Sequence, residues 1–379
     1  MMARLEEICA INMGQSPDSS TYNEDGNGLP FFQGNADFGE IYPAVRMWCS
    51  KPTKIAREKD ILISVRAPIG ALNIANCECC IGRGLAALTV NEDICAQEYL
   101  WHALSGKVDE LNSKGTGSTF KAINKKTLSE TEIPLPPIDE QRKIAAILDK
   151  VSDLIAKRQQ QLDKLDEMIK ARFMEIFGDS ETNTKNWRVL PMSKICSVGS
   201  SKRIYQSEQS SSGVPFWRIS DLTSLITTGT VTPELYIPEE RYKELKTQGQ
   251  VPAPGDILIT SRGTLGQCYI VKVNDRFYFQ DGMISWLSGY MDGVTPLYIS
   301  YLFTMPGFRK QIDSMQAGST VAYLSITMIK KLKVMLPDIE SQQQFASFVS
   351  KTEKTKTTIS RSLEKLETLK KALMQEYFG

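Results

Sequence analysis

Two arginines occupy matching places in the sequence, each just after an apolar run of the length of a β-strand. Arg66 lies in DILISVRAPIG and Arg262 in DILITSRGTLG. A nearby glycine or proline lets the backbone approach another surface closely, and a guanidinium can hold a phosphate or guanine through two hydrogen bonds. Both arginines are therefore candidates for contact with a phosphate group or a base. The alternative is a structural arginine that pairs with a local acid, Asp60 or Asp256.

Other polar side chains on predicted loops could contact phosphates or bases as well. Those just before two long predicted helices could bind phosphate or equally cap a helix end: Ser118, Thr119, Lys121, Ser319, Thr320 and Tyr323. Those after a repeated proline–aromatic segment could reach base edges, although generic loop polarity is the commoner explanation: Gln33, Asn35, Arg218 and Asp221. A basic–aromatic cluster could hold phosphate or be a solvated loop: Lys202, Arg203 and Tyr205.

Residue types for catalysis are scarce in the sequence. It has one histidine, His102, no Walker sequence, and no Asn-Pro-Pro-Tyr or Asp-Pro-Pro-Tyr tetrapeptide of the kind that amino-methylation of bases would want. The glycine loop at Gly115 and Gly117 follows a predicted helix rather than a strand, so it is a poor nucleotide cradle. We therefore expect no catalysis and no cofactor in this chain.

The eight cysteines fit a reducing compartment better than a disulfide framework. Cys9 and Cys196 stand in equivalent places of a repeated sequence, which favours core packing. Cys77 and Cys80 have a CxxC spacing that could begin a zinc site, but no second pair of ligands follows. We predict no metal site.

Two long helices must position these groups. The first lies within Ile133–Gly178, where apolar residues recur at alternating steps of four and three and only Arg158 and Arg172 interrupt the seam. Such a repeat of seven predicts a coiled-coil stripe that needs a partner helix. Pro136 and Pro137 precede the helix and Gly178 ends it. The seam residues are Ile144, Leu148, Val151, Ile155, Leu162, Leu165, Ile169 and Ile176.

The partner helix lies in the same chain, because the sequence repeats itself. From Gly117/Gly318 to Phe177/Phe378 the second copy follows the first at a constant offset of 201 residues. The regions before these segments also repeat, but with drifting offsets: LPFFQ returns as VPFWR, and IGRGLAAL, which contains Arg83, returns as FQDGMISW. Constant helices and variable globular parts predict two unlike heads on a common frame.

Composition bounds the function classes. The chain has 379 residues, 41% of them hydrophobic, and a net charge of +1, so any nucleic-acid footprint is local. No run approaches the length of a membrane span, and no signal-peptide pattern begins the chain. We expect a cytoplasmic protein without membrane contact.

The chain resembles the specificity subunit of type I DNA restriction-modification systems. IPLPPIDEQRKIAAILDKV and its echo VMLPDIESQQQFASFVSKT, the two strand–arginine segments, and the loops GSTF and GSTV carry this resemblance over the whole chain. The echo departs from the first copy in lacking its second proline and its glutamate. The resemblance implies an α+β fold with two mixed α/β target-recognition domains in tandem pseudo-repeat, separated by two long helices packed as an antiparallel coiled coil.

The resemblance also implies partners. Double-stranded DNA would be read as a bipartite site, two methyltransferase subunits carrying S-adenosylmethionine would dock, and a restriction/translocase subunit would join. We expect the first target-recognition domain at 1–132, the first spacer helix at 133–178, the second domain at 179–333 and the second spacer at 334–379. The outward helix faces are candidates for methyltransferase docking or plain solvated faces, with Gln141, Arg142, Lys150, Gln342 and Lys351 as the residues.

Helix length agrees with a split site. A helix from Asp139 to Ile176 is about 57 Å long at 1.5 Å per residue, more than the roughly 34–36 Å between half-sites one duplex turn apart. The competing interpretation is a protein scaffold that does not read DNA, which the near-zero net charge favours and the matched arginines oppose.

Overall fold

The structure is a computed structural model that describes residues 1–117, 121–316 and 322–379. The chain divides into two compact units, and each unit contains parts of both long helices. Unit 1 comprises residues 1–160 and 359–379, and unit 2 comprises residues 161–358. We call the residues before the first long helix the first head, and those between the two long helices the second head.

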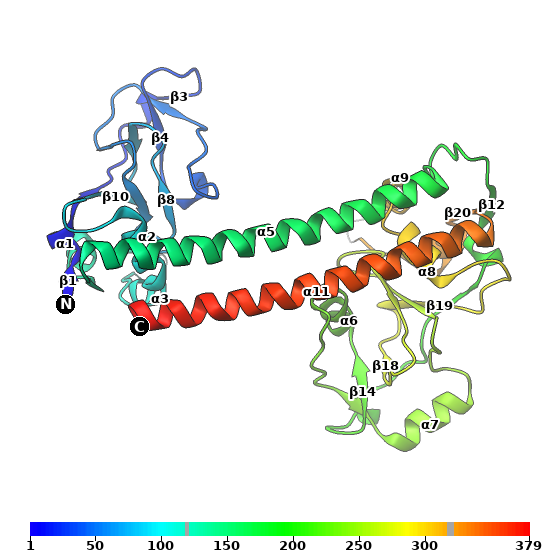
Figure 1. Cartoon of the computed structure of the whole chain (residues 1–379). Coiled ribbons are helices and arrows are strands. Elements are labelled where there is room, and N and C mark those ends of the chain that lie inside the picture. Colours follow the sequence, from blue (N-terminus) through cyan, green and yellow to red (C-terminus); the bar gives the residue numbers. More distant parts are fainter. Residues whose placement is uncertain (118–120, 317–321) are drawn as a thin grey trace. The chain divides into compact units, whose positions relative to one another are not determined.

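The two long helices are α5 (Ile138–Phe177) and α11 (Ile339–Phe378) (Figure 1). Helix α5 begins after Pro136 and Pro137 and ends at Gly178, whose φ of +77° favours glycine. We expected the first spacer helix to begin at position 133. Glu132–Pro134 instead forms strand β11, and the helix begins five residues later, at Ile138.

Half of the predicted apolar seam is buried and the other half is half-buried. The buried residues are Ile144, Leu148, Val151 and Ile169, and the half-buried ones are Ile155, Leu162, Leu165 and Ile176. In unit 1, Ile144 and Leu148 of α5 share a core with Phe378 at the end of α11. In unit 2, Ile169 of α5 shares a core with Phe345 near the start of α11. The start of each helix thus meets the end of the other, which is the antiparallel pairing that we predicted.

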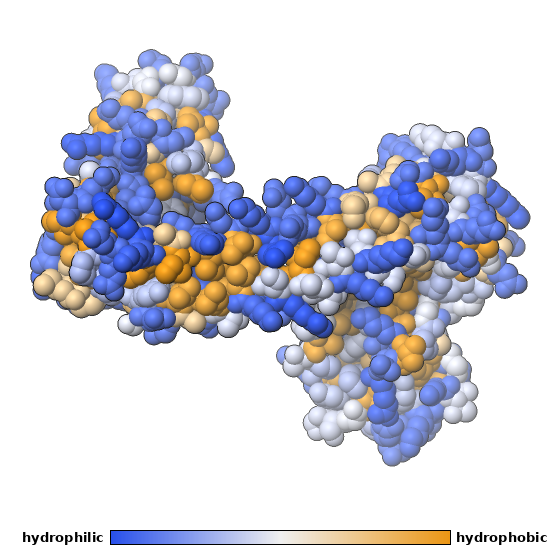
Figure 2. All heavy atoms as spheres, in the orientation of Figure 1, coloured by the Kyte–Doolittle hydropathy of each residue, from blue (hydrophilic) through white to orange (hydrophobic). Residues whose placement is uncertain are grey.

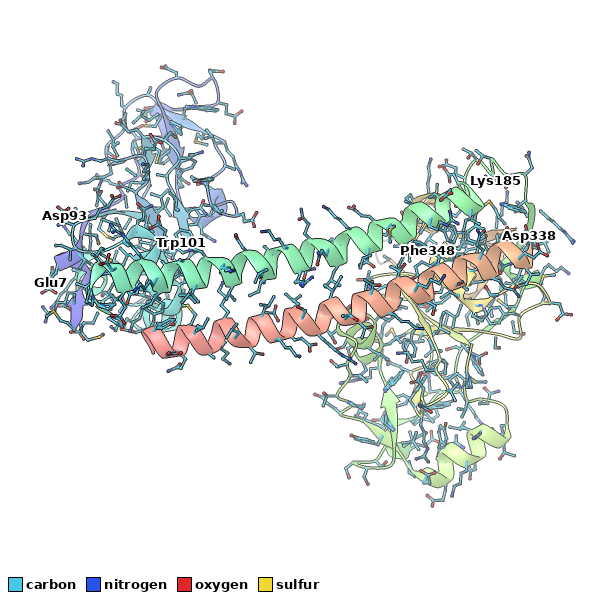
Figure 3. All side chains as sticks on the ribbon, in the orientation of Figure 1. Glu7, Asp93, Trp101, Lys185, Asp338 and Phe348 are labelled. Atoms are coloured by element: carbon cyan, nitrogen blue, oxygen red, sulfur yellow. The ribbon has the colours of Figure 1, made fainter. Side chains whose placement is uncertain are left out.

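Arg172, one of the two predicted interruptions of the seam, is accommodated in unit 2. Its guanidinium carbon lies 5.9 Å from the centroid of the Phe348 ring, and its Nη1 lies 2.7 Å from Oε2 of Glu175. Phe348 projects from the side of α11 that faces α5 (Figure 3). A planar cation over an aromatic face fits an otherwise apolar seam.

The described residues of the first head form three sheets. A two-stranded sheet pairs β1 with β11 at the base of the head, and the antiparallel four-stranded sheet has the order β2-β10-β7-β8. The five-stranded sheet has the order β3-β5-β4-β9-β6, with β4 and β9 parallel. The strands are β1 (Met2–Arg4), β2 (Cys9–Met13), β3 (Tyr22–Asn23), β4 (Leu29–Phe32), β5 (Trp48–Cys49), β6 (Ile55–Ala56), β7 (Ile61–Ser64), β8 (Leu72–Ile74), β9 (Cys79–Ile81), β10 (Leu85–Val90) and β11 (Glu132–Pro134).

The second head repeats this plan with a smaller third sheet. Its sheets have the orders β12-β20, β13-β19-β16-β17 and β15-β14-β18, with β14 and β18 parallel. The strands are β12 (Arg188–Pro191), β13 (Ser197–Gly199), β14 (Val214–Trp217), β15 (Tyr236–Ile237), β16 (Ile257–Thr260), β17 (Cys268–Ile270), β18 (Tyr278–Phe279), β19 (Ile284–Ser288) and β20 (Lys333–Leu336). Among the sheets, the two heads therefore differ most in the third one, which has five strands in the first head and three in the second.

Short helices complete the heads. In the first head they are α1 (Leu5–Ile8), α2 (Gln97–Gly106), α3 (Val108–Ser113), α4 (Lys125–Ser129) and the 3₁₀ turns η1 (Ser19–Thr21) and η2 (Asn35–Asp37). In the second they are α6 (Ile219–Thr228), α7 (Glu239–Thr247), α8 (Pro296–Leu302), α9 (Pro306–Ser314), α10 (Ile326–Lys331), η3 (Met192–Lys194) and η4 (Gln206–Glu208). Within the described ranges no helix has the length and apolarity that a membrane span needs.

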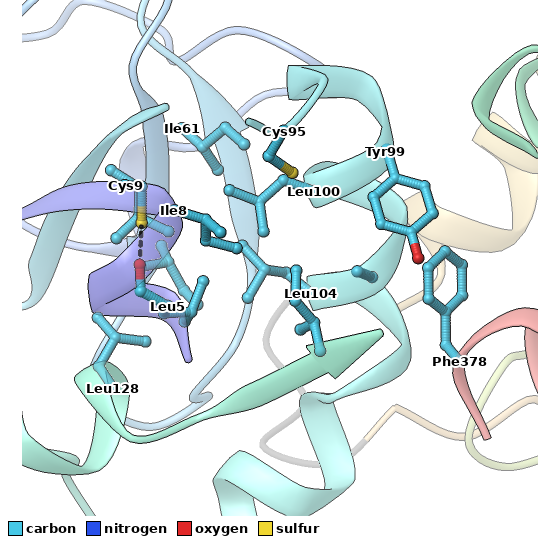
Figure 4. Packing of buried hydrophobic residues seen from close by; sticks show 14 of the residues in the cluster. Leu5, Ile8, Cys9, Ile61, Cys95, Tyr99, Leu100, Leu104, Leu128 and Phe378 are labelled. Atoms are coloured by element: carbon cyan, nitrogen blue, oxygen red, sulfur yellow. Dashed lines mark hydrogen bonds between the residues drawn. The ribbon is translucent and has the colours of Figure 1, made fainter. Parts of the chain in front are cut away.

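Cysteines contribute to these cores as predicted. Cys9 and Cys196 are each 6% exposed, and burial raises the pKa of each thiol to about 12. The Cys9 thiol lies in the core of unit 1 and donates to the carbonyl oxygen of Leu5 at 3.2 Å (Figure 4). Among the residues that the structure describes, no cluster of histidine, cysteine and acidic side chains could hold a metal ion.

Candidate nucleic-acid interface

A buried glutamine fixes the start of each long helix to its head. The side-chain Oε1 of Gln141 accepts from the backbone N–H of Ala96 at 2.9 Å, and its Nε2 donates to the carbonyls of Ile94 at 3.1 Å and Pro136 at 2.8 Å. The loop before α2 and the proline turn before α5 are thereby joined through one side chain. This geometry holds the first head on the helix.

Gln342 does the same in unit 2. Its Oε1 accepts from the backbone N–H of Thr295 at 2.9 Å, and its Nε2 donates to the carbonyls of Gly293 at 2.8 Å and Pro337 at 3.0 Å. Gln141 and Gln342 are only 0% and 1% exposed. Our expectation that they lie on an outward docking face is therefore wrong, and Arg142, Lys150 and Lys351 are the exposed members of that set.

The far end of each helix is held by a tyrosine of the head that it reaches. In unit 1 the rings of Phe378 and Tyr99 have centroids 5.2 Å apart, and the Tyr99 hydroxyl donates to the carbonyl of Pro134 at 2.8 Å. In unit 2 the rings of Phe177 and Tyr298 have centroids 4.9 Å apart. The phenylalanine–glycine ending of both helices thus has a packing role in each unit.

The first head carries a polar hollow beside the end of strand β7, which we call the first hollow. Arg66 lies there, together with Gln33 at the end of β4 and Arg83 in the turn between β9 and β10. All three side chains are exposed. The remaining lining residues are Ser16, Pro17, Ser19, Tyr22 and Gly84, so its charged side chains are both positive.

The second head carries an equivalent hollow beside the end of strand β16, which we call the second hollow. Arg262 occupies the place of Arg66, and its guanidinium carbon lies 5.2 Å from the centroid of the Tyr323 ring. Arg203 also lines this hollow and donates from Nε to Oδ2 of Asp281 at 2.9 Å. The other lining residues are Ile204, Gln209, Phe216, Gln280, Gly282 and Met283.

The acids that could have paired with the two predicted arginines have other partners. Asp60 accepts from the backbone N–H of Arg57 at 2.8 Å, and Asp256 accepts from the backbone N–H of Ala253 at 2.8 Å and from Nε1 of Trp286 at 2.8 Å. Burial raises the pKa of Asp256. In the described ranges neither Arg66 nor Arg262 forms an ion pair, so the alternative of a local structural pair is wrong.

Two predicted base-contacting residues of the second head have a different role. Asp221 is 8% exposed and accepts from the backbone N–H of Arg218 at 2.7 Å at the start of α6. Arg218 Nη2 donates to Oε2 of Glu234 at 2.8 Å, which raises the pKa of the Arg218 guanidinium. Asp221 caps a helix and does not reach solvent, so its predicted base contact is wrong, and Arg218 is already paired.

The other predicted residues are scattered. Lys121 is exposed, and its carbonyl accepts from the N–H of Ala67 beside the first hollow at 3.1 Å. The exposed Lys202 exchanges backbone hydrogen bonds with the Tyr278 hydroxyl, and Asn35 is half-buried in η2. Tyr205 is exposed. The last four lie outside the described residues: Ser118, Thr119, Ser319 and Thr320.

Two equivalent turns that line the hollows contain residues that we did not predict as contacts. Arg83 comes from IGRG, and Gln280 and Asp281 come from the equivalent FQDG. The signal was present, because the two segments align in the internal repeat and a charged side chain occupies the same turn in both. Only the structure shows that these turns line the same hollows as Arg66 and Arg262.

Two heads of one plan, each with an arginine-lined hollow and held on an antiparallel helical pair, invite comparison with known families. The model of the type I restriction modification DNA specificity domain matches residues 1–167 and again residues 184–368. The chain belongs to this family. The second match confirms that the repeat consists of two specificity domains in tandem.

Known relatives agree with this assignment. The putative type I restriction enzyme MjaX specificity subunit of Methanocaldococcus jannaschii is 44% identical over 180 residues, which cover 48% of this chain and 42% of that protein. The MjaIX specificity subunit of the same organism is 24% identical over 377 residues, which cover 91% of this chain and 85% of that protein. The chain thus spans less than half of the length of its 44% identical relative.

Two solved structures share the fold. The S subunit of the type I restriction-modification system from M. genitalium matches with a TM-score of 0.60 at 15% identity, covering 100% of this chain and 96% of that chain. A chain from a structural study of complex assembly and conformational transition of the type I R-M system matches with a TM-score of 0.61 at 16% identity, covering 100% and 97%. At these identities the likeness concerns the fold alone.

Proposed function

We propose that this specificity-domain protein reads a bipartite DNA site, one half-site with each head. The observation that carries the proposal is the pair of equivalent hollows, each with an exposed arginine directly after an equivalent strand. The arginines match in type and place, whereas the rest of the two linings differs. Matched arginines suit a contact with the DNA backbone, which both half-sites share. Differing linings suit base contacts that differ between the half-sites.

The long helices set the distance between the half-sites in this proposal. Each is 40 residues long, or about 60 Å at 1.5 Å per residue, and would separate two half-sequences by an unread spacer. Adding one heptad to both helices would keep the apolar seam in register. We expect the spacer to change and the two half-sequences to remain; altered half-sequences would contradict the assignment of reading to the heads.

Methyltransferase subunits are the partners that we propose for the helices. Apolar atoms are visible on the surface of the helices in unit 1 (Figure 2), where Ile147, Leu154 and Leu369 are 43%, 37% and 46% exposed. Exposed apolar groups beside charged ones such as Lys150 suit a protein interface. The methyltransferase would bring S-adenosylmethionine, a restriction/translocase subunit would join the complex, and this chain would have no catalytic role. Because the proposed target is DNA, we place the protein in the cytoplasm.

The deciding experiment maps modified bases. Genomic DNA from cells that produce this chain together with its methyltransferase subunits is compared with DNA from cells that lack only this chain. We expect a split motif of modified bases that disappears with the chain. If the methyltransferase modifies the same sites without it, or if the assembled complex shifts no DNA, the scaffold interpretation replaces this one.

A further inference from the structure

The turns at Arg83 and Asp281 occupy the same place in the two heads. Each joins a strand that pairs in parallel, β9 with β4 or β18 with β14, to the strand that pairs with β7 or β16. Each turn lines the same hollow as the matched arginine, Arg66 or Arg262. Residues 83 and 281 are thus two versions of one structural position.

The backbone of the first of these turns is closely fixed. The N–H of Arg83 donates to Oγ of Ser16 at 3.3 Å, and the N–H of Gly84 donates to the carbonyl of Gln33 at 3.1 Å. A Cβ on Gly84 would lie 2.4 Å from the same carbonyl oxygen, which real Cβ atoms do not tolerate. A rigid turn with an exposed guanidinium needs little ordering to bind a planar partner.

The charges at this position differ between the heads. Within the described residues the guanidinium of Arg83 has no carboxylate partner, whereas Asp281 is held by Arg203 at 2.9 Å. The first hollow therefore presents two unpaired positive groups, Arg66 and Arg83. In the second hollow Arg262 lies over Tyr323, and Asp281 offsets the charge of Arg203.

We propose that Arg83 is a base-reading residue that selects a guanine in the half-site of the first head. The reasoning rests on the proposed bipartite reading of DNA. A side chain of the same type at equivalent places, as at 66 and 262, suits a contact that both half-sites share, and the phosphate backbone is such a contact. A side chain that differs between equivalent places suits a contact with the bases, because the two half-sites differ in base sequence. An unpaired arginine matches the two acceptors of guanine, O6 and N7.

The test replaces Arg83 by alanine and by lysine in the full chain, assembled with its methyltransferase subunits. Modified bases are then mapped on a DNA library in which both half-sites are randomised. Lysine keeps the charge but not the planar two-point donor. We expect both variants to lose discrimination of about 10- to 100-fold at one G·C pair of one half-site and to leave the other half-site unchanged.

Two matched variants complete the experiment. Arg4→Ala removes an exposed arginine of the first head outside the hollow and should leave the motif intact. Asp281→Ala should alter only the half-site that Arg83→Ala leaves unchanged. That result would also show which half-site each head reads.

Several outcomes would overturn the proposal. A uniform fall in modification with the motif unchanged, especially if lysine restores it, would make Arg83 a phosphate contact. Loss of all modification in both variants while the complex still assembles would exclude base reading too. If the unaltered complex yields no split motif, the proposed function itself fails, whereas an unaltered motif in Arg83→Ala refutes only the role of this residue.

Discussion

Replacing Gln141 by methionine tests how the first head is held on its helix. Methionine has a similar length and volume, so the substitution removes hydrogen bonds without opening a large cavity. It leaves the N–H of Ala96 and the carbonyls of Ile94 and Pro136 without their present partner in a site that excludes solvent. We expect a clear loss of stability in unit 1.

The magnitude follows from three hydrogen bonds. At about 0.5–1.5 kcal/mol of net stabilisation each, their loss costs about 2–4 kcal/mol. For a unit of this size that corresponds to a fall in Tm of about 5–10 °C. Gln342→Met should cost at least as much in unit 2, because Oε1 of Gln342 also accepts from Oγ1 of Thr295 at 3.0 Å.

Thermal denaturation and amide hydrogen exchange together provide the assay. The Ala96 amide should exchange faster in Gln141→Met, and the Thr295 amide in Gln342→Met, because each loses its acceptor. Arg142→Met, at an exposed neighbouring position, is the control and should change Tm little. If Gln141→Met is no less stable than this control, the glutamine does not hold the head and the reasoning is refuted.

Three further predictions concern the helices and the cores. Asp338, at the start of α11 (Figure 3), accepts from the N–H of Ser341 at 2.7 Å, which lowers the pKa of the carboxyl group; Asp338→Ala should lower the free energy of unfolding by about 1 kcal/mol near neutral pH. Because the pKa of Asp338 is lower in the folded state than in the unfolded state, the stability difference between the two proteins should vanish as the pH falls through the folded-state pKa. Calorimetry at several pH values measures this difference, and equal stability at neutral pH would contradict the capping role. Phe177→Ala should cost about 3–5 kcal/mol in urea unfolding, since its ring is fully buried. Cys9 and Cys196 should resist iodoacetamide at pH 8 until the chain is unfolded, because burial raises both thiol pKa values to about 12; rapid labelling of the native protein, seen by mass spectrometry, would contradict their burial.

The burial of Gln141 shows how a sequence pattern can mislead. Gln141 lies three residues before Ile144, so it continues the apolar seam of α5 by position, but its polar side chain suggests an outward face. The structure buries it because the loop before α2 presents one N–H donor and one carbonyl acceptor that a primary amide can satisfy together. Nothing local to α5 encodes the position of that loop.

The sequence alone determined the helices, their apolar seams and the tandem repeat, because periodicity, prolines and a terminal glycine act over a few residues and are read directly from the chain. It also placed Arg66 and Arg262 at equivalent positions. Only the tertiary structure decided that Arg83 and Asp281 line the same hollows and that Asp221 is buried. The places of Arg83 and Asp281 depend on parallel strand pairs between segments distant in sequence, and such pairing leaves no local pattern.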